Sequence, residues 1–189
     1  MATADTLKTY IDMLLEYNEK VNLISRKITG EQLAQLIDET YWLEQYISNN
    51  IIIDAGSGNG ILGIPIALLE KNRKIILVEP KQKKALFLRE VRKKLELSNV
   101  EVQDVSIEEW LKKSKSDNNK GKTLIARGFP RLDALCGFVR RGMINEAVLI
   151  TSENKIKKNQ NDLESVTKKT YNVPLRKNLK ILKMIRGSN

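Results

Sequence analysis

Asp54 stands at the junction of an apolar run and a glycine-rich loop. It follows Ile51–Ile53 and precedes Gly56, Gly58 and Gly60. The isoleucines suit a strand that is buried on both faces of a parallel sheet, and a glycine loop lets a ligand approach the main chain closely. Because a carboxylate would repel a pyrophosphate there, Asp54 suits a ligand with a cationic amino group, such as the methionine end of S-adenosylmethionine.

Glu79 ends the next apolar run, Lys74–Val78, and Pro80 closes it. At that edge of a parallel sheet a carboxylate can accept hydrogen bonds from both ribose hydroxyls of an adenosine. NAD and S-adenosylmethionine both need this contact, so Glu79 predicts a nucleoside cofactor without choosing between them. Residues 58–63 also satisfy G-x-G-x-x-G, which keeps a nicotinamide-dependent oxidoreductase as an alternative.

The composition restricts the chemistry. The 189 residues include no histidine and one cysteine, Cys136. This excludes serine–histidine and cysteine–histidine nucleophiles, histidine metal sites and the histidine acid or base common in dehydrogenases. We therefore expect no metal site and a reaction with little proton transfer, a condition that methyl transfer from a sulfonium meets. The lone cysteine fits a reducing cytoplasm, and no segment reads as a signal peptide or membrane span.

The net charge of +10 is unevenly distributed. Residues 1–50 carry four basic and eight acidic side chains, a net of −4, so the remainder carries +14. Much of this excess lies in Lys71–Lys94, Lys112–Lys122 and Lys155–Arg186. An excess on this scale favours a polyanionic partner. Because only 5% of the residues are aromatic, we expect folded RNA held by its backbone rather than a single-strand stacking platform.

Apolar spacing and capping residues predict alternating elements that position these side chains. One helix starts at Asp5 or Thr6, and a second starts at the capping box Thr29–Gln32 and ends at Asn49 and Asn50. The expected strands are 51–54, 74–79, 100–103, 123–126 and 147–151, with an antiparallel pair within 166–186. The other expected helices follow the glycine loop through Leu69 and cover 81–97 and 132–139, and a polar loop covers 114–122. This order predicts a parallel sheet that is finished by antiparallel strands.

Several motifs along nearly the whole chain carry a family resemblance. They are Tyr17–Leu23, which reads Y-N-x-x-x-N-L, then Asp54–Gly60, Gly63–Pro65, Phe87–Arg89, Ser106–Trp110 and Ala126–Gly128. In these motifs the chain resembles the RsmG (GidB) family, bacterial methyltransferases that modify guanine N7 in small-subunit ribosomal RNA.

The resemblance implies an α/β class I methyltransferase fold, with a Rossmann-like sheet preceded by N-terminal helices. It divides the chain into a helical extension, 1–50, and an S-adenosylmethionine-dependent methyltransferase domain, 51–189. It also implies small-subunit ribosomal RNA or the small ribosomal subunit as the partner. We expect a cytoplasmic monomer that is independent of membranes.

The resemblance also suggests site residues. Arg127 is expected to act at the active-site edge, as a catalytic and cofactor-binding residue. Asn22 and Lys83 match polar positions near the active site or the RNA, although Asn22 also fits a helix C-cap and Lys83 a solvated lysine. Lys81 and Lys84 belong to the same expected RNA-contacting cluster. The other expected cofactor-binding residues are Asp54, Gly56, Ser57, Gly58, Gly60, Ile61, Glu79, Asp104, Ile107 and Glu108.

The chain departs from the family pattern on its RNA-facing side. An Arg-His pair followed by Asp-Ser is usual in the second helix, where this chain reads Gln35–Thr40. A Leu-Lys-Gly is usual at the end of the fifth strand, where this chain reads Ile150–Glu153, with Lys155 the nearest substitute. A non-catalytic relative that binds S-adenosylmethionine or RNA therefore remains an alternative to the methyltransferase.

Overall fold

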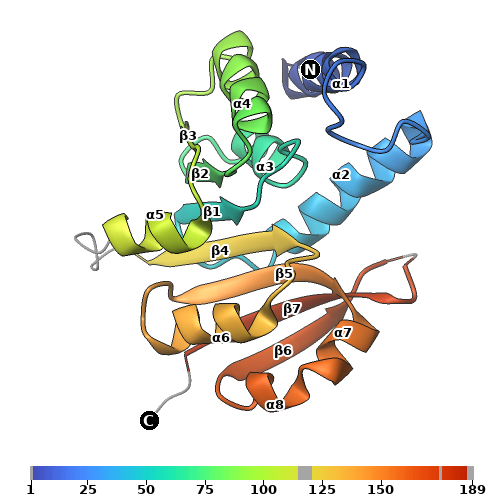
Figure 1. Ribbon diagram of the computed structural model, residues 1–189. Coiled ribbons are helices and arrows are strands. Elements are labelled where there is room, and N and C mark those ends of the chain that lie inside the picture. The colour runs from blue at the N-terminus through green and yellow to red at the C-terminus, as the bar shows by residue number, and fades with distance from the viewer. Residues whose placement is uncertain (1, 115–120, 175, 187–189) are drawn as a thin grey trace.

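The computed structural model describes residues 2–114, 121–174 and 176–186, which form one seven-stranded sheet with helices on both faces (Figure 1). The strand order is β3-β2-β1-β4-β5-β7-β6. The first five strands in this order are parallel, and β7 is antiparallel to both β5 and β6. The fold class is therefore confirmed. The strands are β1 Ile51–Ala55, β2 Lys74–Val78, β3 Val100–Gln103, β4 Lys122–Arg127, β5 Glu146–Ser152, β6 Thr167–Asn172 and β7 Leu179–Ile185.

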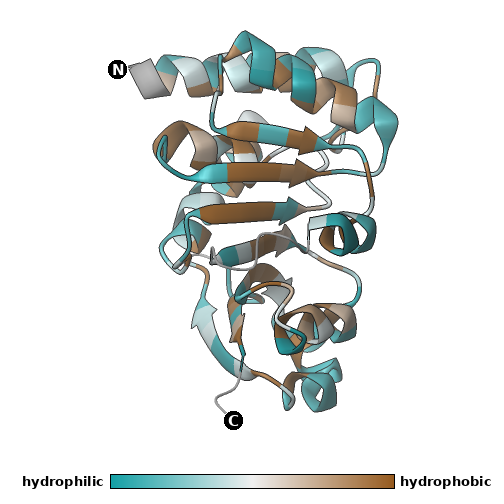
Figure 2. Cartoon of the chain, turned by 90° about the vertical axis from the view of Figure 1, so that its left-hand side faces the viewer, coloured by the Kyte–Doolittle hydropathy of each residue, from teal (hydrophilic) through white to brown (hydrophobic). Residues whose placement is uncertain are grey.

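The strands separate two apolar cores because successive side chains point to opposite faces. Ile52 belongs to one core and Ile53 to the other, and the central strands are apolar along most of their length (Figure 2). The first core is covered by α1 Ala2–Asn18, α2 Gly30–Glu44, α3 Gly63–Leu69 and α4 Gln82–Lys94. The second is covered by α5 Ile107–Lys113, α6 Leu132–Arg140, α7 Glu153–Lys158 and α8 Gln160–Leu163.

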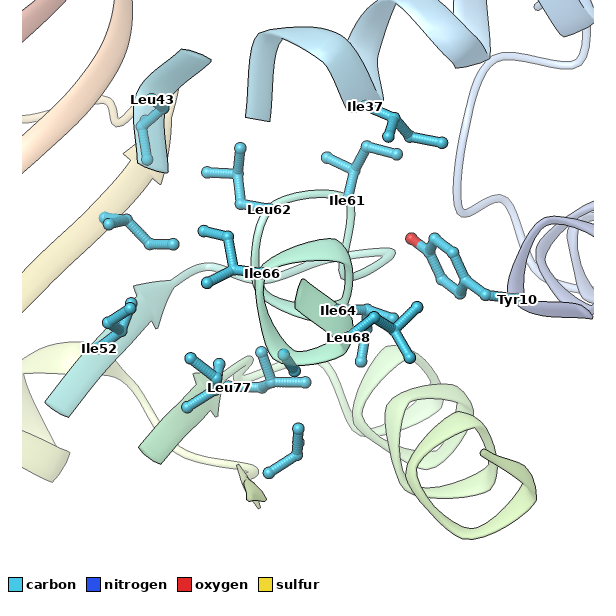
Figure 3. Packing of buried hydrophobic residues seen from close by; sticks show 14 of the residues in the cluster. Tyr10, Ile37, Leu43, Ile52, Ile61, Leu62, Ile64, Ile66, Leu68 and Leu77 are labelled. Atoms are coloured by element: carbon cyan, nitrogen blue, oxygen red, sulfur yellow. The ribbon is translucent and has the colours of Figure 1, made fainter. Parts of the chain in front are cut away.

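The N-terminal helices share the first core with the sheet. Tyr10 of α1 and Ile37 of α2 are buried in the same cluster as Ile61, Ile64 and other residues around α3 (Figure 3). Burying one such side chain contributes about 1.5–3 kcal/mol. The helices α1 and α2 are thus packed against the sheet, and the boundary at residue 50 stays a prediction.

The two N-terminal helices differ from the expected ranges. The helix α1 begins before Asp5 and ends at Asn18, whose side-chain oxygen accepts hydrogen bonds from the Leu23 and Ile24 N–H groups at 2.8 and 2.9 Å. The capping box at Thr29 is confirmed, but α2 ends at Glu44, well before Asn49. The helix α5 and the short helices α7 and α8 do not follow from the apolar spacing. Most of the polar loop 114–122 lies outside the described residues.

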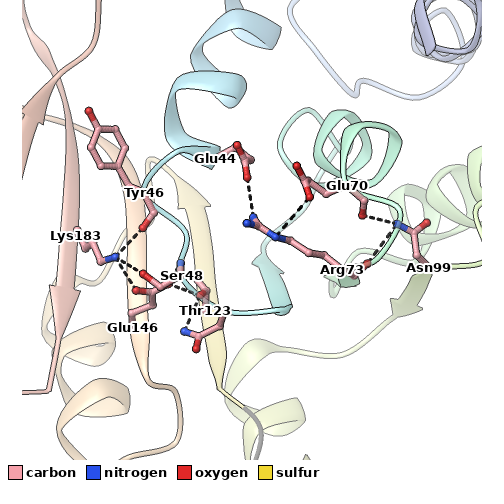
Figure 4. A network of polar contacts seen from close by, with 10 residues as sticks. Glu44, Tyr46, Ser48, Glu70, Arg73, Asn99, Thr123, Glu146 and Lys183 are labelled. Atoms are coloured by element: carbon pink, nitrogen blue, oxygen red, sulfur yellow. Dashed lines mark hydrogen bonds and ion pairs between the residues drawn. The ribbon is translucent and has the colours of Figure 1, made fainter.

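A polar network explains why the chain leaves the helix after Glu44. The Lys183 ammonium contacts Glu146 at 2.9 Å and donates to the Tyr46 carbonyl and the Ser48 hydroxyl (Figure 4). Glu146 also accepts from the Ser48 N–H at 2.6 Å and from Thr123 Oγ1 at 2.5 Å. These bonds join the segment after α2 to β4, β5 and β7, so it cannot continue as a helix.

Candidate functional site

The glycine loop connects β1 to α3 at the carboxyl end of the parallel strands. Hydrogen bonds to the end of β2 hold its backbone, because the Gly56 and Ser57 N–H groups both donate to the Val78 carbonyl, at 2.8 and 3.1 Å. Gly56 has a φ of 72° and Gly58 a φ of 59°, values that suit glycine. A Cβ at Gly56 would meet nothing within 4 Å. The loop therefore offers bare main chain on an open side, where a ligand can approach closely.

Asp54 is buried directly behind this loop. It is 2% exposed, and its Oδ2 accepts a hydrogen bond from the Gly63 N–H at 3.1 Å, at the start of α3. Burial raises the pKa of Asp54 to about 7, with a smaller contribution in the same direction from Glu79 and opposing hydrogen bonds from Gly63 and Ser57. A cationic group that approached Asp54 would favour its ionised form.

Glu79 joins the end of β2 to the glycine loop. Its two carboxylate oxygens accept hydrogen bonds from the Gly58 and Lys81 N–H groups, each at 2.8 Å. Each oxygen carries a second lone pair, so the side chain can bind the loop and still accept hydroxyl groups. The structure thus brings Asp54 and Glu79 to one edge of the sheet, as predicted, and gives Glu79 a structural contact that the sequence does not reveal.

Two residues of the N-terminal helices also contact this loop. The Tyr10 hydroxyl donates to the Asn59 carbonyl at 3.0 Å, and Thr40 Oγ1 donates to the Ile61 carbonyl at 2.8 Å. Both side chains are fully buried, and burial raises the pKa of Tyr10, so its hydroxyl remains a donor. The apolar spacing assigns Tyr10 only to the core; its hydroxyl within the apolar stripe of α1 is the signal for a polar partner.

Arg127 is the last residue of β4 and pairs with Glu39 of α2. Glu39 is 2% exposed and lies 3.4 Å from the Arg176 guanidinium, which in turn donates to the Gln35 side chain at 2.9 Å. The Arg127 Nη1 donates no hydrogen bond within the described part of the chain. Sequence reasoning missed Glu39. The signal was an acid between Leu36 and Leu43 on the apolar face of α2, because such a position requires a cationic partner.

Lys155 lies near Arg127, at the carboxyl ends of β4 and β5. Its ammonium donates to the Phe129 carbonyl in the segment after β4, and its backbone N–H donates to the Ser152 cap of α7. The structure therefore places a lysine next to the segment that follows Arg127, although the chain lacks the lysine that the family usually has at the end of the fifth strand. Its ion-dipole contact joins the β4 and β5 ends of the sheet.

The expected adenine-side residues follow β3. Asp104 pairs with Arg89 at 3.0 Å, and the Arg89 contact holds the pKa of Asp104 below its usual range. Ile107 is buried at the first turn of α5, and Glu108 beside it is exposed. The Ser106 side chain caps this helix by accepting from the Glu109 N–H at 3.1 Å.

The expected RNA-contacting residues are spread over two elements. Lys81 and Lys83 are exposed at the start of α4, and a side chain at Gly58 would come within 3.9 Å of the Lys84 ammonium. Asn22 is exposed in the segment after α1. Within the described part of the chain, no hydrogen bond joins its side chain to the glycine loop. No group of histidine, cysteine or acidic residues suited to a metal ion occurs among residues 2–114, 121–174 and 176–186. Within the same ranges, no helix is long and apolar enough to span a membrane.

Several solved structures with this architecture are described as methyltransferases. A putative O-methyltransferase from Klebsiella pneumoniae has a TM-score of 0.62 at 13% identity and covers 94% of this chain and 90% of its own. A SAM-dependent methyltransferase from Aquifex aeolicus has a TM-score of 0.59 at 14% identity, with coverage of 84% and 100%. The fold is that of the class I methyltransferases.

The sequence itself is more specific than the fold. Residues 3–181 match the family described as rRNA small subunit methyltransferase G, or GidB. The ribosomal RNA small subunit methyltransferase G of Brachyspira hyodysenteriae is 31% identical over 92% of this chain and 83% of its own length. That of Nitrosomonas eutropha is 34% identical over 67% of this chain, but only 57% of its own length is matched. The chain belongs to the GidB family.

Proposed function

We propose that the protein transfers a methyl group from S-adenosylmethionine to guanine N7 in small-subunit ribosomal RNA. The observation that carries this proposal is the open glycine loop between Asp54 and Glu79, in a chain that belongs to the GidB family. The nicotinamide alternative loses its support, because the G-x-G-x-x-G pattern occurs here within a methyltransferase fold.

The residues at the loop fit the proposed cofactor, which would supply an electrophilic sulfonium methyl. Gly56 offers the free main chain that a side chain would obstruct. Asp54 is a buried carboxyl that a ligand ammonium would ionise, and Glu79 has acceptor capacity for ribose hydroxyls. Ile61 would line the cofactor together with Gly56. Ile107 and the backbone at Glu108 would hold its adenine side, with Asp104 as a neighbour.

The reaction requires little acid–base chemistry from the protein. Guanine N7 carries an exposed lone pair, so it can attack the methyl carbon without prior deprotonation while the carbon–sulfur bond breaks. The positive charge of the sulfonium ends on the methylated base, and no proton moves. The task of the protein is then to hold the base in line with the methyl group. We assign this task to Arg127 at the carboxyl end of β4.

The altered RNA-facing positions support a second candidate, a relative that binds the cofactor or RNA without transferring the methyl group. Gln35 contacts Arg176 where the family usually has a cation of its own. An assay with labelled S-adenosylmethionine on small-subunit RNA and on assembled subunits separates the two candidates, followed by mapping of the modified base. We expect a single N7-methylated guanine. Binding of S-adenosylmethionine without transfer to either substrate would select the second candidate.

We further propose that residues 1–50 are a helical extension and residues 51–189 the methyltransferase domain. Tyr10 and Thr40 support a role for the extension in shaping the cofactor loop, because both donate to its carbonyls.

A further inference from the structure

The C-terminal hairpin of β6 and β7 is the most basic part of the sheet. Residues 167–186 contain seven lysines and arginines and no acid. Lys180 and Lys183 are paired with Glu153 and Glu146, and Arg176 with Glu39. In the described part of the chain, Lys169 forms no ion pair and is exposed at the edge strand β6. Its charge is available to a partner.

A hollow of about 300 Å³ opens beside Lys169, on the α2 side of the hairpin. Its lining includes Gln45, Tyr46, Tyr171 and Lys183. The two tyrosine rings stack with centroids 4.1 Å apart at an interplanar angle of 27°. Lys183 donates to the Tyr46 carbonyl and contacts Glu146, so these bonds hold the backbone at Tyr46 in place beside β7. No acidic residue of the described chain lines it.

This hollow shares one lining residue, Gln45, with a second hollow on the side of the proposed active site. The second hollow, of about 170 Å³, is lined by Trp42, which is 40% exposed, and by Glu39, the partner of Arg127. Glu39 and Gln45 are six positions apart along α2 and its C-cap, which at a rise of about 1.5 Å per residue corresponds to roughly 9 Å. That distance corresponds to about three stacked nucleotides.

We propose that the hollow lined by Tyr46, Tyr171 and Lys169 binds unpaired nucleotides of the RNA that flank the target base. The proposal rests on the proposed function, since it names a second contact for the same substrate. Stacking on aromatic rings accepts any base, and Lys169 supplies a contact for the backbone phosphate. The low aromatic content of the chain does not exclude this site, because two rings suffice for it.

The test uses the full-length protein, a labelled single-stranded oligouridylate and an RNA duplex as probes. Tyr171→Leu keeps an apolar side chain but removes the ring, and Tyr171→Phe keeps the ring as the matched control. We expect the Kd for the single strand to rise about tenfold in Tyr171→Leu and to stay within about twofold in Tyr171→Phe. The Kd for the duplex should not change, because paired bases cannot stack on the tyrosine.

Lys169→Glu tests the charge without disturbing the core, and Lys112→Glu on the opposite face of the sheet is its control. We expect Lys169→Glu to reduce the slope of log affinity against log salt for the single strand by about 0.7. Equal losses for single strand and duplex in Tyr171→Leu, or an unchanged slope in Lys169→Glu, would overturn the proposal. So would sedimentation that shows the parent as a dimer which Lys169→Glu dissociates. These measurements need no methyl transfer, so an inactive parent would refute the function and leave the binding result intact.

Discussion

At the scale of single residues, the buried carboxyl of Asp54 should make the affinity for the cofactor depend on pH. Its pKa is raised to about 7, so below that pH the group is neutral in the free protein and must lose its proton to bind an ammonium. We expect the affinity for S-adenosylhomocysteine to rise up to about tenfold per pH unit below pH 7 and to level off above it. Calorimetry measures this, and Asp54→Asn should flatten the profile.

The same shift affects the stability of the ligand-free protein. Because the folded pKa lies above the unfolded value, the contribution of Asp54 is present at low pH and is lost as the pH rises through about 7. Asp54→Asn should therefore gain stability relative to the parent between pH 5 and pH 8. Identical pH dependence of both melting and ligand affinity in the two proteins would contradict the role of this carboxyl.

Glu79→Gln tests the second carboxylate. An amide has one acceptor oxygen where the carboxylate has two, so either the Gly58 or the Lys81 N–H loses its partner, as does a ribose hydroxyl. We expect the affinity for S-adenosylhomocysteine to fall by about 1.5–3 kcal/mol, measured by calorimetry. Glu101→Gln on β3 is the control. If both variants bound like the parent, Glu79 would be a structural residue only.

Arg127 should affect methyl transfer more than RNA binding. Replacement by alanine would leave Glu39 without its nearest cation, a change that destabilises buried pairs, so Arg127→Lys is the variant of choice. We expect its methyl-transfer rate at saturating RNA to fall on the order of 10- to 100-fold, because a displaced cation no longer orients the base. The Kd for RNA, measured in parallel, should change little. A parent-like rate would move the positioning role to another residue.

At the scale of elements, the helix α1 should influence cofactor binding through one hydroxyl. Tyr10→Phe removes the hydrogen bond to the Asn59 carbonyl and keeps the buried ring. We expect a loss of about 0.5–1.5 kcal/mol in the affinity for S-adenosylhomocysteine. The matched control is Tyr17→Phe on the same helix, whose ring packs against Phe87. An equal effect of both variants would indicate a general loss of stability instead of a specific contact with the loop.

The helix α4 offers an internal comparison for RNA binding. Lys81 and Lys83 lie at its start, beside the glycine loop, and Lys93 and Lys94 lie at its end. Lys81→Glu combined with Lys83→Glu should weaken RNA binding and reduce the salt slope by roughly 0.7 to 0.9 per lost phosphate contact, with cofactor affinity nearly unchanged. The pair Lys93→Glu and Lys94→Glu should leave the slope as in the parent. The reverse result would place the RNA at the opposite edge of the sheet.

The sequence predicts the central strands β1, β2, β4 and β5 closely because each contains an apolar run that is followed by a polar residue. Val100–Gln103 is predicted without error. The end of α2 is missed because Ser48 and Asn49 bind Glu146 and Thr123, which are 98 and 74 residues away along the chain. Local spacing favours a longer helix, since Ile47 continues the apolar pattern and is buried. Only the tertiary partners stop it.

The candidate site divides in the same way. Asp54 and Glu79 can be placed from the sequence, because parallel strands that end in acids bring them to one edge. The contacts of Tyr10 with Asn59 and of Glu39 with Arg127 cannot, because they span 49 and 88 residues. Such contacts depend on how the N-terminal helices pack on the sheet, which no local pattern specifies.

For the whole molecule, the strand order has a consequence for the way the protein is made. The strand β7 is the last in the sequence, yet it lies between β5 and β6. During synthesis, β6 therefore has no neighbour with which to pair, and β5 exposes an unpaired edge, until residues 179–185 have left the ribosome. The parallel strands can assemble while the chain is still growing, but the basic hairpin and the hollow beside Tyr171 form last. The surface that we propose to bind unpaired nucleotides therefore depends on the pairing of β7 with both β5 and β6.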